Sequence, residues 1–311
     1  MIWDSLSLVP SVAILGPGGV GGFLAGALAR AGEDVLVVAR EPTAELISRD
    51  GLEVRSVRLG DFSATLTATA ALTIATQVLI VAVKATALMG SLERVQIPPR
   101  LVVPLLNGLD HMEILRQRFD PTTVAGGVIR IESDRPEPGR ILQTSAFLRV
   151  DLAADDPVLR DRLRDLAGAL ERAEVPATVG SSEAQILWGK LVRLNPLALT
   201  TSTYDVPIGV IRSEHRAELE ACIQEAAAAA NADGAQIDPA DPLAELDDAH
   251  AELGSSMQRD IAAGRQPELD AIAGSVLRAA VRHGLECPTI ARLTVAVAKR
   301  AGIAPPAAAT R

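Results

Sequence analysis

The chain has 311 residues, of which 48% are hydrophobic and 22% are charged, a composition typical of a globular protein rather than a disordered one. Its formal net charge of -9 at pH 7 argues against a general binder of phosphate backbones, because such proteins need a basic surface; we therefore expect no nucleic-acid partner. The length favours two domains over one.

The longest apolar runs, such as residues 78–83 (VLIVAV), are far shorter than the roughly 20 residues that a membrane-spanning helix needs. The N-terminal segment contains Asp4 and no basic stretch, which is untypical of a secretory signal peptide. We therefore expect a cytoplasmic protein with no membrane partner. Cys222 and Cys287 are expected to be buried and unpaired, and the four scattered histidines lack metal-binding spacing, so we expect no metal.

The first predicted elements are a strand, a glycine turn, a helix and a second strand. The strand is 12–15 (VAIL), the turn is 16–22 (GPGGVGG), and a helical pattern over 23–31 stops at Gly32. Residues 35–39 (VLVVA) are rich in β-forming side chains. This βαβ order predicts an α/β domain with a Rossmann-like parallel sheet.

Gly16, Gly18 and Gly21 satisfy the pattern G-x-G-x-x-G between the strand and the helix. Glycine permits the tight turn and the close approach of a pyrophosphate, and the N-terminus of the helix supplies free N–H groups. The turn, including Gly19 and Val20, is therefore predicted to bind a dinucleotide.

The end of the second strand distinguishes NAD from NADP. An acidic residue there usually binds the ribose 2′-hydroxyl, whereas an arginine accommodates a 2′-phosphate. This chain has Arg40, which favours NADP(H). The neighbouring Glu41 is expected to face solvent, because adjacent residues at a strand end point to opposite sides.

Two later strands end in polar residues. Lys84 follows the strand 78–83, and Asn107 follows the strand 101–106 (LVVPLL). Ligands of open α/β sheets lie outside the carboxyl ends of the strands, so both residues are candidates for a ligand-facing rim. The alternatives are a solvated charge for Lys84 and an Asn-Gly turn for Asn107.

The remainder of the first domain, residues 1–180, reads as a turn-rich stretch at 132–140, a helix over 157–175 and a short strand at 176–180. From there to the end, residues 181–311 follow a helical pattern. We expect an α/β domain followed by an all-α domain, with the active site in a cleft between them.

Within the second half, the pattern predicts an alanine-rich helix over 217–234, a loop around Pro239 and Pro242, a short helix over 254–264 and a longer one over 267–284. The alanine-rich helix indicates close helix packing. The helical domain could also pair with a copy of itself, which would make the protein a homodimer.

Lysine is scarce in this chain. Lysine and arginine together number 30, and only Lys84, Lys190 and Lys299 are lysines. A lysine ammonium can give up a proton where an arginine guanidinium cannot. Lys190 lies in 186–192 (ILWGKLV), at the start of the helical domain, and is the strongest candidate for proton transfer.

In this order and spacing, the motifs resemble the ketopantoate reductase (2-dehydropantoate 2-reductase) family over nearly the whole chain. The matching pieces are the GPGGVGG turn, Arg40, VAVKA with Lys84, LLNG with Asn107, GGVIRIE followed by PGRI, LWGKL with Lys190, GSSM with Ser256 and PELD with Glu268.

The resemblance implies a Rossmann-like domain followed by an all-α domain like the C-terminal domain of 6-phosphogluconate dehydrogenase. It also implies an NADPH-dependent reductase of a 2-oxo acid, first of all ketopantoate, in pantothenate and coenzyme A biosynthesis. By that resemblance Lys190 is the general acid and Glu268 orients substrate and cofactor. Lys84 and Asn107 contact the cofactor and the carbonyl side of the substrate, and Ser256 contacts its carboxylate. From helix position alone, Glu268 could instead be a first-turn acid favoured by the helix dipole.

The chain departs from the family's pantoate-reducing members at three positions where they have asparagine: Leu194, Ala198 and Leu253. Asn195 is one residue displaced, which on a helix turns its side chain by about 100°. A site without these amides has fewer hydrogen-bond partners for a substrate hydroxyl, which favours a more apolar 2-oxo acid or another ketone.

Two other functions remain alternatives. Opine and 3-hydroxyacid dehydrogenases also have a Rossmann domain followed by helices, but the LLNG motif and the spacing from Ser256 to Glu268 disfavour them. A non-catalytic NADP-binding sensor is disfavoured because both Lys190 and Glu268 are present.

Overall fold

The computed structural model of the chain describes residues 11–309, so Asp4 and the rest of the segment used for the signal-peptide interpretation lie outside the described residues. The chain divides into two compact units. Within the described residues, one, here the sheet unit, comprises residues 11–106 and 111–183; the other, the helical unit, comprises residues 107–110 and 184–309. The division after residue 183 is close to the predicted boundary at 180, but four residues from the middle of the chain group with the helices.

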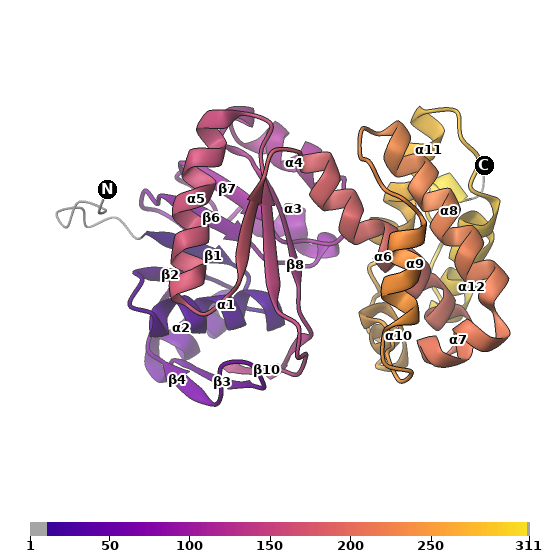
Figure 1. Cartoon of the computed structure of the whole chain (residues 1–311). Helices are drawn as coiled ribbons and strands as arrows, with labels where there is room; N and C mark the ends of the chain where they lie inside the picture. Colours follow the sequence, from indigo (N-terminus) through magenta and orange to yellow (C-terminus); the bar gives the residue numbers. More distant parts are fainter. Residues whose placement is uncertain (1–10, 310–311) are drawn as a thin grey trace. The chain divides into compact units, whose positions relative to one another are not determined.

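The sheet unit is a mixed α/β structure (Figure 1). Its elements, in chain order, are β1 (Val12–Leu15), α1 (Gly19–Arg30), β2 (Val35–Val38), α2 (Glu41–Asp50), β3 (Leu52–Ser56), β4 (Phe62–Ala64), β5 (Thr67–Thr69), β6 (Val78–Val81), η1 (Ala85–Ala87), α3 (Leu88–Leu92), β7 (Leu101–Pro104), α4 (His111–Arg118), η2 (Pro121–Thr123), β8 (Gly126–Arg130), β9 (Ser133–Glu137), β10 (Arg140–Gln143), β11 (Arg149–Ala153), α5 (Pro157–Arg172) and β12 (Ala177–Gly180).

The central sheet has the strand order β5-β2-β1-β6-β7, and all its pairs are parallel. This confirms the predicted parallel sheet, although β2, β6 and β7 end one or two residues earlier than expected. The residues of β1, β2, β6 and β7 are all buried, which explains their continuous apolar runs. The strand β1 lies between β2 and β6, so the strands that follow it are added first on one side of β1 and later on the other. Ligands of such sheets bind at the carboxyl ends of the strands at this point.

Helix α1 is buried from Gly21 through Leu28, as expected for a helix that is apolar on all sides. It contacts β1 and β2 of the central sheet and also β3, β4, β9 and β10 of a second sheet, whose order is β4-β3-β10-β9. The expectation of a turn-rich stretch at 132–140 was therefore wrong, since β9 and β10 fall within or overlap it and pair antiparallel across Pro138 and Gly139. The strand β10 is stabilised by parallel pairing with β3, which is distant in sequence.

A third sheet, β12-β11-β8, is covered by α5. The predicted helix over 157–175 is confirmed as α5, which begins with Asp156 as N-cap and Pro157 in the first turn. The predicted strand at 176–180 is confirmed as β12.

In the region that the structure describes, all regular elements of the helical unit are helices. Its elements are α6 (Glu183–Tyr204), whose first residue belongs to the sheet unit, α7 (Ile208–Glu214), α8 (Arg216–Ala232), α9 (Ala240–Asp247), α10 (Ser256–Ala262), the π-helical turn η3 (Asp270–Gly274), α11 (Ser275–Arg282), α12 (Pro288–Ala301) and η4 (Ala307–Ala309).

Two details differ from the prediction. The loop predicted around Pro239 and Pro242 ends at Pro239, the N-cap of α9, and Pro242 lies in the first turn of that helix, where a missing N–H leaves no helical bond unmade. The helix predicted over 267–284 is interrupted by η3, so its regular part is α11. Such π turns are often associated with functional sites.

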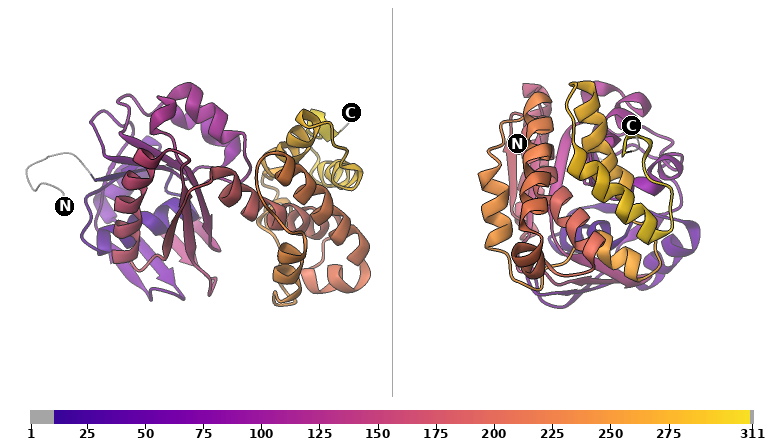
Figure 2. Two further views of the ribbon diagram at one scale, coloured as in Figure 1. Left: turned by 45° about the horizontal axis from the view of Figure 1, so that its top comes forward. Right: turned by 90° about the vertical axis from the view of Figure 1, so that its right-hand side faces the viewer.

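The core of the helical unit forms where α8 packs against α11 and α12 (Figure 2, right view). Buried alanines of α8 permit this close packing. Cys222 and Cys287 are free and buried in the same core, as predicted.

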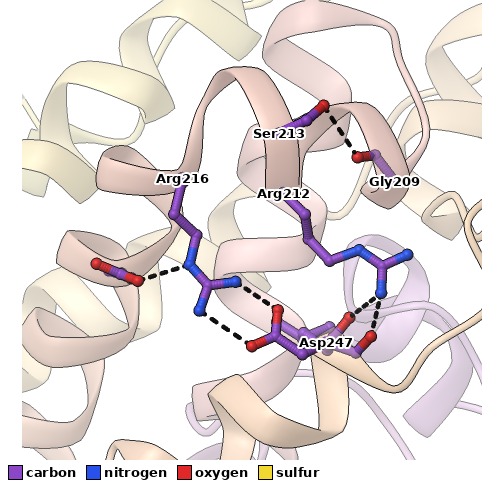
Figure 3. A network of polar contacts seen from close by, with 7 residues as sticks. Gly209, Arg212, Ser213, Arg216 and Asp247 are labelled. Atoms are coloured by element: carbon purple, nitrogen blue, oxygen red, sulfur yellow. Dashed lines mark hydrogen bonds and ion pairs between the residues drawn. The ribbon is translucent and has the colours of Figure 1, made fainter.

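A polar network joins the N-terminal end of α8 to α7 and α9 (Figure 3). Arg216 at the start of α8 pairs with Asp247 at the end of α9, and Arg212 of α7 donates to the backbone carbonyls of Leu246 and Asp247. A cation at a helix C-terminus satisfies carbonyls that have no partner within the helix.

None of the helices within residues 11–309 is long and apolar enough to cross a membrane. The same residues contain no group of three or more histidine, cysteine, aspartate or glutamate side chains that could hold a metal ion.

Candidate active site

The glycine turn follows β1 as predicted. Gly16 has a φ of +94°, a conformation that favours glycine, and its carbonyl accepts a hydrogen bond from the N–H of Gly18 at 2.9 Å. A Cβ on Gly21 would lie only 2.1 Å from the carbonyl oxygen of Gly16, so α1 can pack against the turn only with glycine there. These two glycines are required by the fold itself.

Gly18 differs from them. A Cβ at this position would meet no protein atom within 4 Å, and its φ of -76° is accessible to any residue. Gly18 is the N-cap of α1, and no side chain caps that terminus, so the first N–H groups of the helix, beginning with Gly19 and Val20, have no capping side chain. This uncapped helix end, free of side-chain bulk, fits a bound pyrophosphate.

Arg40 is exposed and is the N-cap of α2, immediately after β2, with Glu41 next to it as the first residue of the helix. Arg94 approaches the same end of the sheet. Its Nη1 lies 3.5 Å from the carbonyl oxygen of Ala39 and 3.1 Å from that of Ala70. The carboxyl end of β2 therefore has two arginines, of which only Arg40 was predicted.

Lys84 is exposed and is the N-cap of η1, shortly after β6. Since β6 is parallel to β1 and adjacent to it, Lys84 lies at the same edge of the sheet as the glycine turn. Lys84 is thus at the predicted edge of the sheet.

Two residues of β9 also contact the glycine turn. Ser133 Oγ donates to the carbonyl oxygen of Gly19 at 2.9 Å, and Arg135 Nη1 lies 3.5 Å from the carbonyl oxygen of Pro17. Neither residue was predicted, because residues 132–140 were expected to form turns.

Asn107, Lys190 and Glu268 come together within the helical unit. Lys190 Nζ on α6 donates to Asn107 Oδ1 at 2.8 Å, and Asn107 Nδ2 donates to Glu268 Oε2 at 3.1 Å. The three side chains are partly exposed, so solvent or a ligand can reach them. The amide of Asn107 therefore links a cation and a carboxylate that lie far apart in the sequence.

Asn107 belongs to the short segment 107–110, which groups with the helical unit although nothing in its sequence indicates this. Asp110 Oδ2 accepts from Arg278 Nη2 at 2.6 Å, and Arg278 Nη1 donates to Asp270 Oδ1 at 2.7 Å. Burial opposes the charged form of Arg278, but its bonds to Asp270 and Asp110 outweigh this and raise the pKa of the guanidinium above its usual value.

Ser256 is not part of this cluster. It is the exposed first residue of α10, and among the described residues no hydrogen bond joins it to Asn107, Lys190 or Glu268. The preceding Ser255 is buried, caps α10 by accepting from the N–H of Gln258, and accepts a bond from Thr201.

The three positions that lack the family's asparagines carry apolar side chains that are at least partly buried. Leu194 lies one turn after Lys190 on the same face of α6 and is partly buried, while Ala198 and Leu253 are buried in the core. The displaced Asn195 is fully buried and donates to the carbonyl oxygen of Ile272 at 3.1 Å. Its amide is thus used to bind the π turn.

Comparison with known proteins identifies the family. A sequence profile described as "Ketopantoate reductase PanE/ApbA" matches residues 12–154, and its companion "Ketopantoate reductase PanE/ApbA C terminal" matches residues 184–301. Among similar proteins, an uncharacterized oxidoreductase (YkpB) of Bacillus subtilis is 27% identical over 89% of this chain and 94% of its own length. A 2-dehydropantoate 2-reductase of Caulobacter vibrioides is 26% identical over the same shares of the two chains.

The fold is also shared with solved structures. The 2-dehydropantoate 2-reductase of Geobacter metallireducens has a TM-score of 0.84 and 27% identity, with 93% of this chain and 99% of that chain covered. A D-mandelate dehydrogenase bound to NADH and anilino(oxo)acetate has a TM-score of 0.85 at 19% identity, covering 94% of this chain and 98% of that chain, and shows likeness of fold. With profiles of one family matching both units, the chain belongs to the ketopantoate reductase PanE/ApbA family of oxidoreductases.

Proposed function

We propose that this enzyme uses NADPH to reduce a 2-oxo acid to the corresponding 2-hydroxy acid, ketopantoate being the first candidate. The observation that carries the proposal is the hydrogen-bonded cluster of Lys190, Asn107 and Glu268 in a chain of the ketopantoate reductase family. With ketopantoate, the product would be pantoate for pantothenate and coenzyme A biosynthesis.

The cluster has the groups that this reaction requires. A bound nicotinamide cofactor supplies the hydride to the ketone carbon. Lys190 Nζ donates a proton to the ketone oxygen as negative charge develops on it, so that the ketone becomes an alcohol and the ammonium becomes an amine. Asn107, bonded to Lys190, orients this ammonium, and Glu268 fixes the amide through its other end. We assign Ser256 a contact to the substrate carboxylate on the family resemblance alone.

The cofactor is proposed to bind along Gly16, Gly18, Gly19, Val20 and Gly21. The uncapped N-terminus of α1 supports this assignment because its free N–H groups suit a pyrophosphate. Lys84 at the same sheet edge and Asn107 are proposed as further contacts to the cofactor.

NADPH preference is proposed to depend on Arg40 together with Arg94. Two guanidinium groups near the end of β2 suit a 2′-phosphate, and a hydrogen bond to a charged group is worth about 1.5–3 kcal/mol. Replacing either arginine with alanine should therefore weaken NADPH binding about 10–100-fold and leave NADH binding nearly unchanged. Fluorescence titration of both cofactors measures this.

Arg49→Ala is the matched control, since Arg49 lies on α2 and pairs only locally with Asp50. It should change neither affinity. Equal affinities of the wild type for NADPH and NADH would refute the cofactor preference.

The substrate could be less polar than ketopantoate, and Leu194 is the observation that favours this second candidate. Leu194 lies on the face of α6 that carries Lys190 and provides no hydrogen-bonding side chain for a hydroxyl. The two candidates are separated by measuring NADPH oxidation with ketopantoate and with apolar 2-oxo acids of similar size.

If the apolar candidate is right, wild-type kcat/KM should be higher for the apolar acids, and Leu194→Asn should raise the ratio of kcat/KM for ketopantoate over them about tenfold or more. Leu194→Met is the control because it keeps the site apolar. A wild type that prefers ketopantoate would select the first candidate, whereas one that turns over no 2-oxo acid would refute the proposed reaction.

A further inference from the structure

The segment Asn107–Asp110, here called the strap, follows β7 of the sheet unit in sequence but groups with the helical unit. Its first residue, Asn107, holds Lys190 and Glu268 through the two ends of one amide. An amide can form both hydrogen bonds at once only within a narrow range of distances and angles. The backbone that carries it must therefore be fixed.

The middle of the strap lies directly against the π turn η3. Gly108 has a φ of +86°, and a Cβ there would lie 2.1 Å from the carbonyl oxygen of Ala271. Leu109 packs on the apolar core of the helical unit. The backbone of the strap therefore lies directly against the backbone of η3, with no room for a side chain between them.

The far end of the strap is fastened by Arg278 of α11. Its Nη2 donates to Asp110 Oδ2 at 2.6 Å and to the backbone oxygen of Asp270 at 3.1 Å, while its Nη1 donates to Asp270 Oδ1 at 2.7 Å. A Cβ on Gly274 would lie 2.3 Å from Asp270 Oδ1 and 2.9 Å from Arg278 Nη1, so glycine at this position leaves room for the arginine to reach Asp270. The planar guanidinium suits such a multiple contact better than a lysine ammonium.

These contacts all lead to the same stretch of chain, residues 268–271. Asp270 opens η3 and lies two residues after Glu268, so Arg278 connects the strap to the same stretch of chain that carries the carboxylate of the cluster. One end of the strap is bonded to Glu268 through Asn107, and the other is bonded to Asp270 through Arg278 and Asp110.

We propose that Arg278 is a positioning residue, which by joining Asp110 to Asp270 keeps the amide of Asn107 between Lys190 and Glu268. This inference rests on the proposed function of that cluster. Arg278 touches neither Lys190 nor Asn107 through any hydrogen bond of the described residues, so its effect on the reaction passes through the strap and through Asp270.

The test compares Arg278→Met, Asp110→Asn and the double variant with Arg282→Met. Arg282 lies one turn later on the same helix and pairs at 3.2 Å with Asp233, so its variant removes another arginine–aspartate ion pair of α11, away from the strap. Stopped-flow absorbance of NADPH gives the rate of hydride transfer in a single turnover, and titration gives the Kd of NADPH.

For Arg278→Met we expect hydride transfer to slow about 10–100-fold, because displacement of a catalytic group by about 1 Å can have this effect, with the Kd of NADPH unchanged. Asp110→Asn should act in the same direction, and the double variant should be no slower than Arg278→Met, since both changes break one link. Arg278→Lys should recover some of the lost rate. Amide hydrogen exchange of a peptide covering the strap should be faster in Arg278→Met than in Arg282→Met.

A rate for Arg278→Met equal to that of Arg282→Met would overturn the proposal, as would effects of the two single variants that multiply. The proposed function fails by a different result, namely a wild type that reduces no 2-oxo acid. In that case unchanged hydrogen exchange in Arg278→Met would overturn the fastening of the strap as well.

Discussion

Replacing Lys190 with methionine is expected to lower kcat for the reduction of the 2-oxo acid about 10²–10⁴-fold, the usual contribution of a positioned general acid. The physical reason is that methionine leaves the alkoxide without a proton donor, while Asn107 retains its bond to Glu268. The measurement is steady-state NADPH oxidation with saturating cofactor and 2-oxo acid.

Lys190→Arg separates proton transfer from charge. Arginine keeps the positive charge but does not give up a proton at ordinary pH, so this variant should be nearly as slow as Lys190→Met. Lys299→Met, which changes an exposed lysine on α12, should leave kcat unchanged. If Lys190→Arg kept most of the wild-type kcat, Lys190 would act by charge alone.

Replacing Gly18 with alanine should raise the Kd of NADPH about 10–100-fold while the protein remains folded. The added methyl group meets no protein atom within 4 Å, and alanine at this N-cap costs about 1 kcal/mol of stability. It does occupy the space through which a pyrophosphate would approach the N–H groups of α1, and each lost hydrogen bond to a charged group is worth about 1.5–3 kcal/mol. Titration of NADPH and thermal denaturation measure the two quantities.

Gly21→Ala is the matched control and should show the opposite pattern. Its Cβ would lie 2.1 Å from the carbonyl oxygen of Gly16, so the turn or α1 must shift, at a cost of about 1–3 kcal/mol or more in the free energy of unfolding. A Gly18→Ala protein that binds NADPH as tightly as the wild type would show that the cofactor does not approach this face of the turn.

The parts of the fold that depend on local patterns were predictable. The buried strands β1, β2, β6 and β7 appear as apolar runs, and their ends are marked by glycine, arginine, lysine and asparagine. The strands β9 and β10 were missed because their sequence contains two prolines and a glycine, and what stabilises β10 is pairing with β3, more than 80 residues earlier. Long-range pairing of this kind leaves no periodic signal in the strand itself.

In the candidate site, too, only the residues that belong to local sequence motifs were predictable. Lys190, Asn107 and Glu268 could be named from their motifs, but only the folded chain shows that Asn107 bonds to the other two. Arg94 and Arg278 have no local signal at all, since a chain with 27 arginines, counted as 30 basic residues less three lysines, offers no reason to single out either. Their placement depends on carbonyl and carboxylate oxygens contributed by distant segments.

The strap also determines how this protein can be recombined with its relatives. The helical unit is encoded in two pieces, a short one within the first half of the gene and a long one at its end. A chimera that exchanged residues 184–311 alone would combine Arg278 and Glu268 of one parent with the strap of the other. The residues that must come from the same parent are therefore discontinuous in the sequence. A chimera that keeps them together must take residues 107–110 from the parent that supplies residues 184–311.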